Sequence, residues 1–494
     1  MLLARWGGQR AGPVGWLTGI LVAALAFGLT PDVLWVSQAK GALLALYVLV
    51  VLWPALLLYN IVRQAGGIDA LAGALQRAIR QRAVLLLVVA WAFSGALEGL
   101  AGFGIPIAIV APMLVGLGVT PVTAVAAVAV GHAWAVTFGD MGVILQSLVA
   151  VTGIEPGVLA PAAALMLGVV CLLCGQATAR ILRQGVSWRV VWIVAGVMAG
   201  VQALLAWIGL TPLAALGAGL AGIAAGVALG RGRAGQPHVG APPGAADSRQ
   251  AALGPTLAVY GGLALLMTVL IGMPPVKAAL DPVAWRVAFP EVRTLEGHVT
   301  PAGFGQVFRI FTHPGASILL AVMLSALFYR RLGLVNAAGW GEAWRATWRA
   351  AAPASAGILS MVGLSALMEH CGMTLLLAQG LSVWMGQAFP LASPLVGILG
   401  AFATGSNTNS NVLFGPMQKS IAGLLGVAPA VLLAAQTAGG SLGSMIAPAK
   451  LIVGCSTVGL AGRDGEVLRI TLPYGALIGL ALGVVTWLAV NFGF

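Results

Sequence analysis

A few ionisable side chains stand inside segments of the chain that are otherwise apolar. They are Glu98, His132, Asp140, Glu369, His370 and Lys450, with Lys419 close behind. A charged side chain near the centre of a bilayer costs at least about 2.5 to 3.5 kcal/mol, so such residues are functional candidates by default. We expect Glu98 to carry a proton. The alternative is that its carboxyl caps a broken helix through a hydrogen bond.

Three of these side chains have expected roles that depend on their positions. Asp140 and Lys450 lie beside corresponding Gly-x-Met sites in two parts of the chain, so we expect them either to form an ion pair or to face water at separate helix ends. His132 precedes Asp140 by eight residues. It is a candidate for relaying a proton, although a hydrogen-bonded histidine in the core is the more common situation.

The stretch ALEGLAGFGIPIAIVAPM, residues 96–113, interrupts an apolar run with Glu98, with Gly102, Phe103 and Gly104, and with Pro106. Gly and Pro both weaken or end helices. Within a bilayer, a break in a helix is tolerated only where protein or water in a cavity satisfies the freed backbone groups. The sequence therefore predicts that this segment lines a cavity.

A second interruption is strongly polar. Its hydroxyl and amide side chains are Thr404, Ser406, Asn407, Thr408, Asn409, Ser410 and Asn411. They stand between two apolar runs and can replace much of the hydration of a carboxylate or a hydroxyl group. Half-helices whose N-termini meet at a common centre would also favour an anion through their free N–H groups. The alternative is a polar loop on the surface.

The elements that position these residues must be membrane helices. Of the 494 residues, 60% are hydrophobic and 8% are charged, whereas a soluble domain has about 25% charged residues. The 69 glycines allow helices to approach closely and tolerate breaks in them. We therefore expect an all-α polytopic protein with about twelve transmembrane helices, some of them broken or re-entrant, and not a β-barrel.

Other classes of protein fit the composition poorly. The net charge of +12 comes from Lys and Arg that lie mostly in short loops, where they set orientation, so nucleic-acid binding is not expected. Cys171 and Cys174 have no further zinc ligands nearby, and no metal, disulfide framework or cofactor is expected. A membrane aspartyl protease needs two carboxylates that share a proton, and the apolar segments hold no second Asp beside Asp140. No enzyme activity is expected.

A segment rich in Gly, Pro and Ala divides the chain. Residues 231–254 cannot bury a core, so we expect a flexible cytoplasmic linker between an N-terminal transmembrane half, 1–230, and a C-terminal half, 255–494. In each half, a break is followed by an apolar segment, an LGVxP turn and a small-residue helix that ends in Gly-x-Met, at 116–142 and 424–448. Paired interruptions of this kind are the best sequence indication of a secondary transporter's binding site.

Loop charges and aromatic residues predict the orientation. Arg-rich loops that belong in the cytoplasm by the positive-inside rule lie at 63–82, 180–189 and 330–349. They place the N-terminus inside and the nearly neutral loop 273–314 outside. Three tryptophans spaced four residues apart within 340–348 indicate either a helix in the membrane interface or an ordinary loop helix.

Several segments together resemble the L-lactate permease family. They are LEGLAGFGIPIAI (97–109), TFGDMG (137–142), VTGIEPG (151–157), TGSNTNSNVLFGPMQ (404–418) and the run 438–474. The resemblance follows chain order through both halves and covers most of the chain apart from the linker. It implies a multi-pass carrier of the cell (inner) membrane that takes up L-lactate, and often glycolate or D-lactate, together with a proton.

The family pattern also implies site residues. It includes Glu98, Gly102, Phe103, Gly104 and Pro106 in the first motif, and Thr404, Gly405, Ser406, Thr408, Ser410 and Asn411 in the second. The polar tip is similar to the Ser-Asn-Thr hairpin tips of dicarboxylate and sodium symporters. By that analogy the halves would be inverted repeats, and re-entrant hairpins would move as an elevator against a fixed scaffold.

The chain departs from the family pattern at five positions. The family commonly has Asp where Asn407 stands, a small residue at Asp140, Asn near His132, and Gln then Ser where Ala449 and Lys450 stand. An acid is missing from one repeat, while an acid and a base are present elsewhere, so the charge in the pocket is redistributed. A substrate larger or more charged than lactate stays open as an alternative.

The expected function is a proton-coupled symporter of 2-hydroxy-monocarboxylates in the lipid bilayer. The substrate carboxylate would lie between the two breaks, the polar residues from Ser406 to Asn411 would bind it, Glu98 or Asp140 would take the proton, and Lys450 would supply the countercharge. Coupling to sodium or transport of another small organic anion is the alternative, and a passive channel is a further one. The sequence does not set the oligomeric state, so a homodimer stays open.

Overall fold

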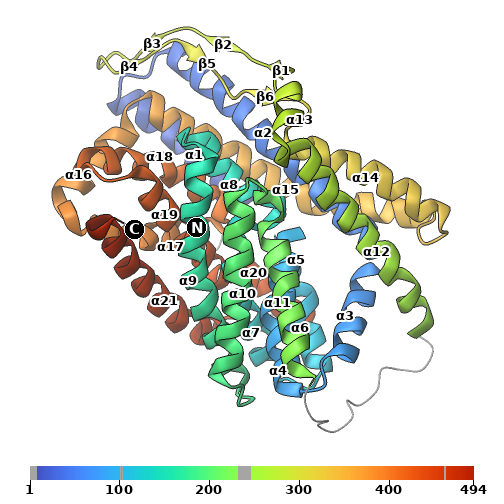
Figure 1. Ribbon diagram of the computed structural model, residues 1–494. Helices are drawn as coiled ribbons and strands as arrows, with labels where there is room; N and C mark the ends of the chain where they lie inside the picture. Colours follow the sequence, from blue (N-terminus) through green and yellow to red (C-terminus); the bar gives the residue numbers. More distant parts are fainter. Residues whose placement is uncertain (1–7, 101, 103, 232–245, 461–462, 494) are drawn as a thin grey trace.

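The chain folds almost entirely into helices (Figure 1). The computed structural model describes residues 8–100, 102, 104–231, 246–460 and 463–493. Within this part of the chain, 11 helices are long and apolar enough to cross a membrane. The expectation of an all-α polytopic membrane protein is confirmed, with 11 candidate spans where the sequence predicted about twelve.

Four long helices form an outer group. They are α1 (Gly8–Ala26), α2 (Pro31–Gln64), α14 (Pro314–Arg331) and α15 (Ala337–His370). Helix α2 packs against α14 and α15, and α1 packs against α15. Thr30 begins α2 because its Oγ1 accepts a hydrogen bond from Val33 N at 3.3 Å. Helix α12 (Ala246–Met267), followed by a π-helical turn at Thr268–Gly272, packs against α14 and against α3 (Gly67–Ala78).

The first predicted break is present. The span before it consists of α4 (Arg82–Val88), a π-helical turn (Val89–Phe93) and α5 (Ser94–Leu100), and the helix after it is α6 (Ile105–Gly116). Gly104 has a φ of 83°, a left-handed conformation that glycine adopts without strain. Pro106 stands in the first turn of α6, where its missing N–H group has no helical partner to lose.

The second break separates α17 (Phe389–Thr404) from α18 (Asn407–Leu425), which pack against each other as a hairpin. Gly405, with a φ of 74°, ends α17. Ser406 caps α18, and its Oγ accepts a hydrogen bond from Asn409 N at 3.4 Å. Because the side chains from Asn407 to Asn411 are buried, the polar segment is the tip of an internal hairpin and not a surface loop.

An interrupted helix follows each hairpin. The first consists of α7 (Pro121–Gly131), the 3₁₀ segment η2 (Ala133–Phe138) and α8 (Gly139–Thr152), and the second consists of α19 (Pro429–Ile446) and α20 (Pro448–Thr457). Pro448 lies within the first turn of α20 and prevents α19 from continuing. The order of hairpin and broken helix is the same in both halves. That the halves are inverted repeats stays a prediction.

Other helices surround these elements. They are α9 (Pro156–Leu182), α10 (Trp188–Trp207), α11 (Ala214–Gly230), α16 (Met373–Met385) and α21 (Asp464–Phe492), with 3₁₀ turns at Thr211–Leu213 and Gly386–Ala388. Helix α9 packs against α7, α10 and α19, α11 packs against α5, and α21 packs against α17 and α19. The broken segments are therefore enclosed by helices, as the backbone of a broken membrane helix requires.

Short strands that the sequence did not predict follow α13 (Pro274–Leu280) in the loop before α14. The antiparallel pairs are β1 (Ala284–Trp285) with β6 (Phe308–Arg309), β2 (Ala288–Phe289) with β5 (Gly303–Phe304), and β3 (Val292–Arg293) with β4 (Val299–Thr300). They form one ribbon across the end of the molecule that lies uppermost in Figure 1. Leu295 N donates to Gly28 O at 2.8 Å, which holds the ribbon on the turn between α1 and α2.

Two further expectations concern segment boundaries. The tryptophans at 340–348 do not form a separate helix, because they occupy the first turns of α15, which continues to His370. Of the predicted linker, residues 232–245 lie outside the described residues, and α12 begins at Ala246.

Candidate functional site

The second break and Glu98, which precedes the first break, line a cavity of about 310 Å³. Its walls come from the tip of the α17–α18 hairpin, the starts of α8 and α20, and one face of α15. The predicted site residues that line it are Glu98, Asp140, Thr404, Ser406, Asn407, Thr408, Asn409 and Lys450. Gly102, Gly104, His132, Ser410 and Asn411 are buried but do not line it. Phe103 lies outside the described residues.

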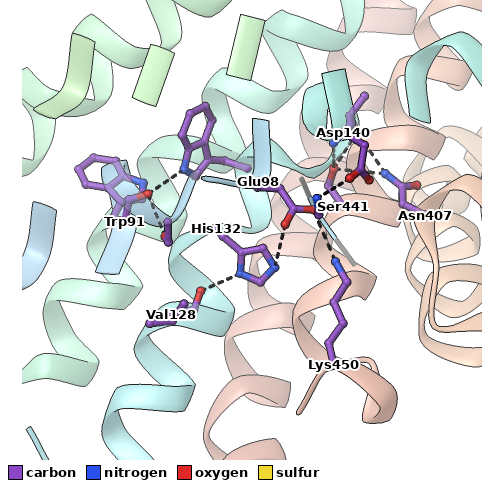
Figure 2. A network of polar contacts seen from close by, with 12 residues as sticks. Trp91, Glu98, Val128, His132, Asp140, Asn407, Ser441 and Lys450 are labelled. Carbon is purple, nitrogen blue, oxygen red and sulfur yellow. Dashed lines mark hydrogen bonds and ion pairs between the residues drawn. The ribbon is translucent and has the colours of Figure 1, made fainter. Parts of the chain in front are cut away.

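Four ionisable side chains are buried close together, and three of them, Glu98, Asp140 and Lys450, line this cavity. Figure 2 shows Lys450 and His132 on two sides of the Glu98 carboxyl group. Lys450 Nζ lies 3.6 Å from Glu98 Oε1, and His132 Nε2 lies 4.0 Å from Glu98 Oε2. The exposed fractions are 0% for Glu98 and His132, 3% for Asp140 and 7% for Lys450. Charges this well shielded from water interact strongly.

Neither alternative for Asp140 and Lys450 is found, since both side chains are buried and no ion pair within 4.0 Å joins them in the described part of the chain. Lys450 pairs with Glu98 instead, and Asp140 Oδ1 accepts a hydrogen bond from the backbone N–H of Gly102. Gly102 stands outside any helix, so its N–H group has no helical acceptor. The break therefore supplies the donor that Asp140 uses.

Gly102 stands between the two carboxyl groups. A Cβ atom at this residue would lie 2.7 Å from Glu98 Oε1 and 2.8 Å from Asp140 Oδ2. The two carboxyl groups are therefore near neighbours, separated only by space that a glycine leaves open. Two carboxylates in such proximity repel each other when both are ionised.

The backbone that carries Asp140 is strained. Asp140, Met141 and Gly142 have φ values of 50°, 54° and 81°. A left-handed conformation costs roughly 1 to 2 kcal/mol for each residue other than glycine. Strain of this kind persists where the surrounding structure imposes it, and it clusters at functional sites. Here the reversal lies between η2 and the rest of α8, where the Asp140 carboxyl is at the cavity wall.

A buried polar network joins the hairpin tip to the broken helices. Asn407 Nδ2 donates to Thr437 O at 3.1 Å and to Thr137 Oγ1 at 3.3 Å. The hydroxyl oxygens of Thr137 and Ser441 lie 2.7 Å apart. Asn411 Nδ2 donates to Thr437 Oγ1 at 2.8 Å. Asn407 and Asn411 therefore fix the hairpin against η2 and α19, and sequence reasoning missed their partners because these hydroxyls look like ordinary helix residues.

The spacing Gly-Gly-Ser-Leu-Gly at 439–443 matches the G-x-S-x-G motif of serine hydrolases. That motif acts on a sharp turn between a strand and a helix. Ser441 instead lies inside α19 and is hydrogen-bonded to Thr137. The match is therefore a coincidence of a small-residue helix.

Some buried oxygen atoms in the described residues have no hydrogen-bond partner. Asn409 Oδ1 and Ser444 Oγ belong to residues that line the cavity. Asn407 Oδ1, also without a partner, packs against Gly440. Buried polar atoms are normally paired, so an unpaired one marks a position for a ligand, an ion or water. The cavity wall therefore offers acceptors for a hydroxyl group.

The remaining intramembrane candidates lie elsewhere. Lys419 Nζ donates to Thr152 O at 2.6 Å, at the C-terminal end of α8, where a cation is favourable. His370 Nδ1 lies 2.7 Å from Ala366 O. Glu369 precedes it at the end of α15. None of the three lines the cavity.

Sequence reasoning missed one charged residue of the cavity. Arg349 lines it together with Pro353 and Gly357, which follow at intervals of four residues on one face of α15. We had interpreted Arg349 only as a loop charge that sets orientation. The sequence pattern that could have identified it is the row of small and apolar residues that follows Arg349 on one face of the helix. Small residues are typical of helix faces that meet other parts of the protein and not lipid.

The comparisons with known proteins agree with this architecture. The family model described as L-lactate permease matches residues 1–493. Among curated relatives, the L-lactate permease of Bacillus subtilis (strain 168) is 27% identical over 99% of this chain and 93% of its own length. The glycolate permease GlcA of Escherichia coli (strain K12) is 26% identical over 99% of this chain and 92% of its own length.

Solved structures show a similar fold. The YdaH transporter of Alcanivorax borkumensis has a TM-score of 0.59 at 17% identity and covers 99% of both chains. MtrF of Neisseria gonorrhoeae has a TM-score of 0.53 at 16% identity, over 98% of this chain and 95% of the other. The protein is a multi-pass membrane transporter with the helical fold of these carriers, and, since the family model matches nearly its whole length, it belongs to the L-lactate permease family.

Proposed function

We propose that this protein transports L-lactate and related 2-hydroxy-monocarboxylates, such as glycolate and D-lactate, across the cell (inner) membrane together with a proton. The observation that carries the proposal is the buried group of two carboxyls and one lysine at the same cavity as the polar hairpin tip. The names of the two relatives, L-lactate permease and glycolate permease, support the substrate class.

The hairpin tip provides the substrate site in this proposal. The N-terminus of α18 presents free N–H groups and the positive end of the helix dipole, which attract the substrate carboxylate. Either Asn409 Oδ1 or Ser444 Oγ, which have no partners of their own, accepts the one hydrogen bond that the 2-hydroxyl group donates. A 2-hydroxy acid has both groups on adjacent carbons, so one short molecule makes both interactions.

Charge balance couples the substrate to the proton. With Glu98 and Asp140 ionised and Lys450 protonated, the buried group has one excess negative charge and repels an anion. A proton on either carboxyl removes this excess, so proton binding and anion binding favour each other. His132, whose ring is oriented by Val128 O at 2.7 Å, provides a neighbouring position for a proton beside Glu98.

In the proposed mechanism, movement of the two halves opens this site first to one side of the membrane and then to the other. Residues 1–230 and 255–494 would act as repeats around a cytoplasmic linker, and the hairpins would move against the outer group of α1, α2, α14 and α15. A protease site placed within residues 232–245 should be cut in inside-out membrane vesicles and protected in right-side-out vesicles. The opposite pattern would contradict the proposed orientation.

One observation favours sodium as an alternative coupling ion. The amide oxygens of Asn407, Asn409 and Asn411 are all buried without partners, and amide oxygens are suitable ligands for a hard cation. In this case the two carboxyl groups near Gly102, those of Glu98 and Asp140, would be structural. Substrate uptake would not depend on the pH gradient.

Transport into proteoliposomes distinguishes these functions. Purified protein should accumulate radiolabelled L-lactate above equilibrium when the outside is acidic, and a protonophore should abolish the accumulation. Accumulation driven by a sodium gradient at equal pH would support the sodium alternative. Equilibration without accumulation under either gradient would indicate a passive channel and contradict both.

A further inference from the structure

The cavity has a second cation that the proposed lactate site does not use. Lys450, on one wall, already has Glu98 as its ion-pair partner at 3.6 Å. Arg349 lines the wall formed by α15, and its side chain has no ion pair or hydrogen bond within the described part of the chain. Arg349 is exposed, so it lies where the cavity opens to solvent. An unpaired guanidinium group there is available to an anion.

Arg345, the neighbouring arginine of α15, differs from Arg349 because its guanidinium group has partners. Arg345, one turn before Arg349, pairs with Glu342 at 3.1 Å and bonds the carbonyl oxygen of Gly341. It does not line the cavity. Two arginines of similar exposure therefore differ, since one is neutralised on the outer surface and the other is free at the cavity.

The rest of the α15 wall offers no other polar side chain. Its cavity-lining residues besides Arg349 are Ala350, Pro353, Ala354, Gly357 and Ile358. The one polar side chain that a ligand can contact on this wall is therefore a cation. Guanidinium groups bind carboxylates through two parallel hydrogen bonds.

The cavity is larger than lactate requires. Its volume is about 310 Å³. It lies at the lower end of the range of about 300 to 1,000 Å³ in which drug-sized ligands bind. A molecule of six non-hydrogen atoms at the hairpin tip leaves room towards Arg349.

We propose that Arg349 forms a second carboxylate-binding position, so that the site also accepts 2-hydroxy acids with a second carboxylate, such as malate or tartronate. The first carboxylate and the hydroxyl group bind at the hairpin tip as in the proposed function, on which this inference rests, and the second carboxylate binds the Arg349 guanidinium group. A dianion then balances the two cations when Glu98 and Asp140 are both protonated. Arg349 is therefore a specificity-determining residue for substrate charge.

Competition and binding measurements test the proposal with the variant Arg349→Gln and its matched control Arg345→Gln. In proteoliposomes, L-malate and tartronate should inhibit the uptake of labelled glycolate by the unaltered protein. In Arg349→Gln, their inhibition constants should rise about tenfold or more, as expected for the loss of a charge-assisted hydrogen bond, with a much smaller rise in the KM for L-lactate. Arg345→Gln should retain the inhibition constants of the unaltered protein.

A second measurement keeps this inference separate from the proposed function. If the unaltered protein transports neither lactate nor glycolate, the proposed function fails, and thermal shift of purified protein with L-malate still reports binding at Arg349. A malate-dependent shift that is lost in Arg349→Gln supports the inference. The absence of malate binding by the unaltered protein would overturn it, as would an equal weakening of malate and lactate in Arg349→Gln.

Discussion

Glu98 and Lys450 form an ion pair across the two halves of the chain, with 3.6 Å between Glu98 Oε1 and Lys450 Nζ. The side chains are 0% and 9% exposed. Glu98 comes from the span that ends at the first break, and Lys450 comes from α20 after the second broken helix. Helix α20 also packs against α6. The pair therefore fixes the first hairpin against the second interrupted helix.

The losses of stability from removing each partner of this pair should not be additive. Lys450→Met leaves Glu98 buried without its cation, which should lower the free energy of unfolding by about 3 to 5 kcal/mol. The double variant Glu98→Gln with Lys450→Met should lose less than the sum of the single variants, because the charge that Lys450→Met leaves unpaired at Glu98 is absent from it. Thermal unfolding of the purified proteins in detergent measures the difference. Additive losses would mean that the two groups do not interact.

Glu98→Gln should separate substrate exchange from proton-driven accumulation. The amide resembles the protonated carboxyl, so the variant should still exchange external for internal lactate in counterflow. It should no longer accumulate lactate when a pH gradient is imposed, because position 98 can no longer release a proton. Accumulation that survives in this variant would assign the proton to Asp140 instead.

Gly102→Ala should abolish coupled transport with little loss of folded protein. The new methyl group would stand 2.7 Å from Glu98 Oε1 and 2.8 Å from Asp140 Oδ2, so both carboxyl groups must move. Overpacking of this kind costs typically about 1 to 3 kcal/mol. Gly116→Ala, at a position where a Cβ would meet nothing within 4 Å, is the control and should transport normally. Normal transport by Gly102→Ala would show that the spacing of the carboxyl groups is unimportant.

Two substitutions at the hairpin tip should weaken lactate binding. Asn409→Ala removes an acceptor at the cavity wall, and Ser406→Ala removes the cap that holds the start of α18. We expect each to raise the dissociation constant of L-lactate about tenfold or more, the effect of one hydrogen bond to a charged or strongly polar group. Ser420→Ala, further along α18 and bonded to Pro416 O at 3.0 Å, is the matched control. Unchanged affinity in both tip variants would move the substrate site elsewhere.

Much of this architecture could be predicted from the residues. Gly and Pro near Gly102, and the cluster of hydroxyls and amides around Asn409, identified both breaks, because membrane helices are interrupted only where something else satisfies the backbone. Burial of Glu98 and Asp140 followed from their apolar surroundings. The convergence of the two breaks at one cavity required the tertiary fold.

The partners of the buried charges could not be predicted. A single sequence placed Asp140 and Lys450 near equivalent sites, but it contained no information on which carboxyl Lys450 would meet. The choice depends on Gly102, whose N–H group is occupied by Asp140 and whose missing side chain leaves both carboxyls room. Arg349 was missed for a similar reason. Its position on the cavity face of α15 depends on the course of a helix that continues from the tryptophans at 340–348 to His370.

The left-handed backbone at residues 140–142 sets the direction in which the carboxyl group at position 140 points. Asp140 has a φ of 50°, in a region that glycine, asparagine and aspartate adopt more readily than other residues. A variant that tests the acid at position 140 should therefore be Asp140→Asn with Met141 and Gly142 preserved, since asparagine tolerates this backbone conformation and a residue placed on a regular helix nearby would lack its direction.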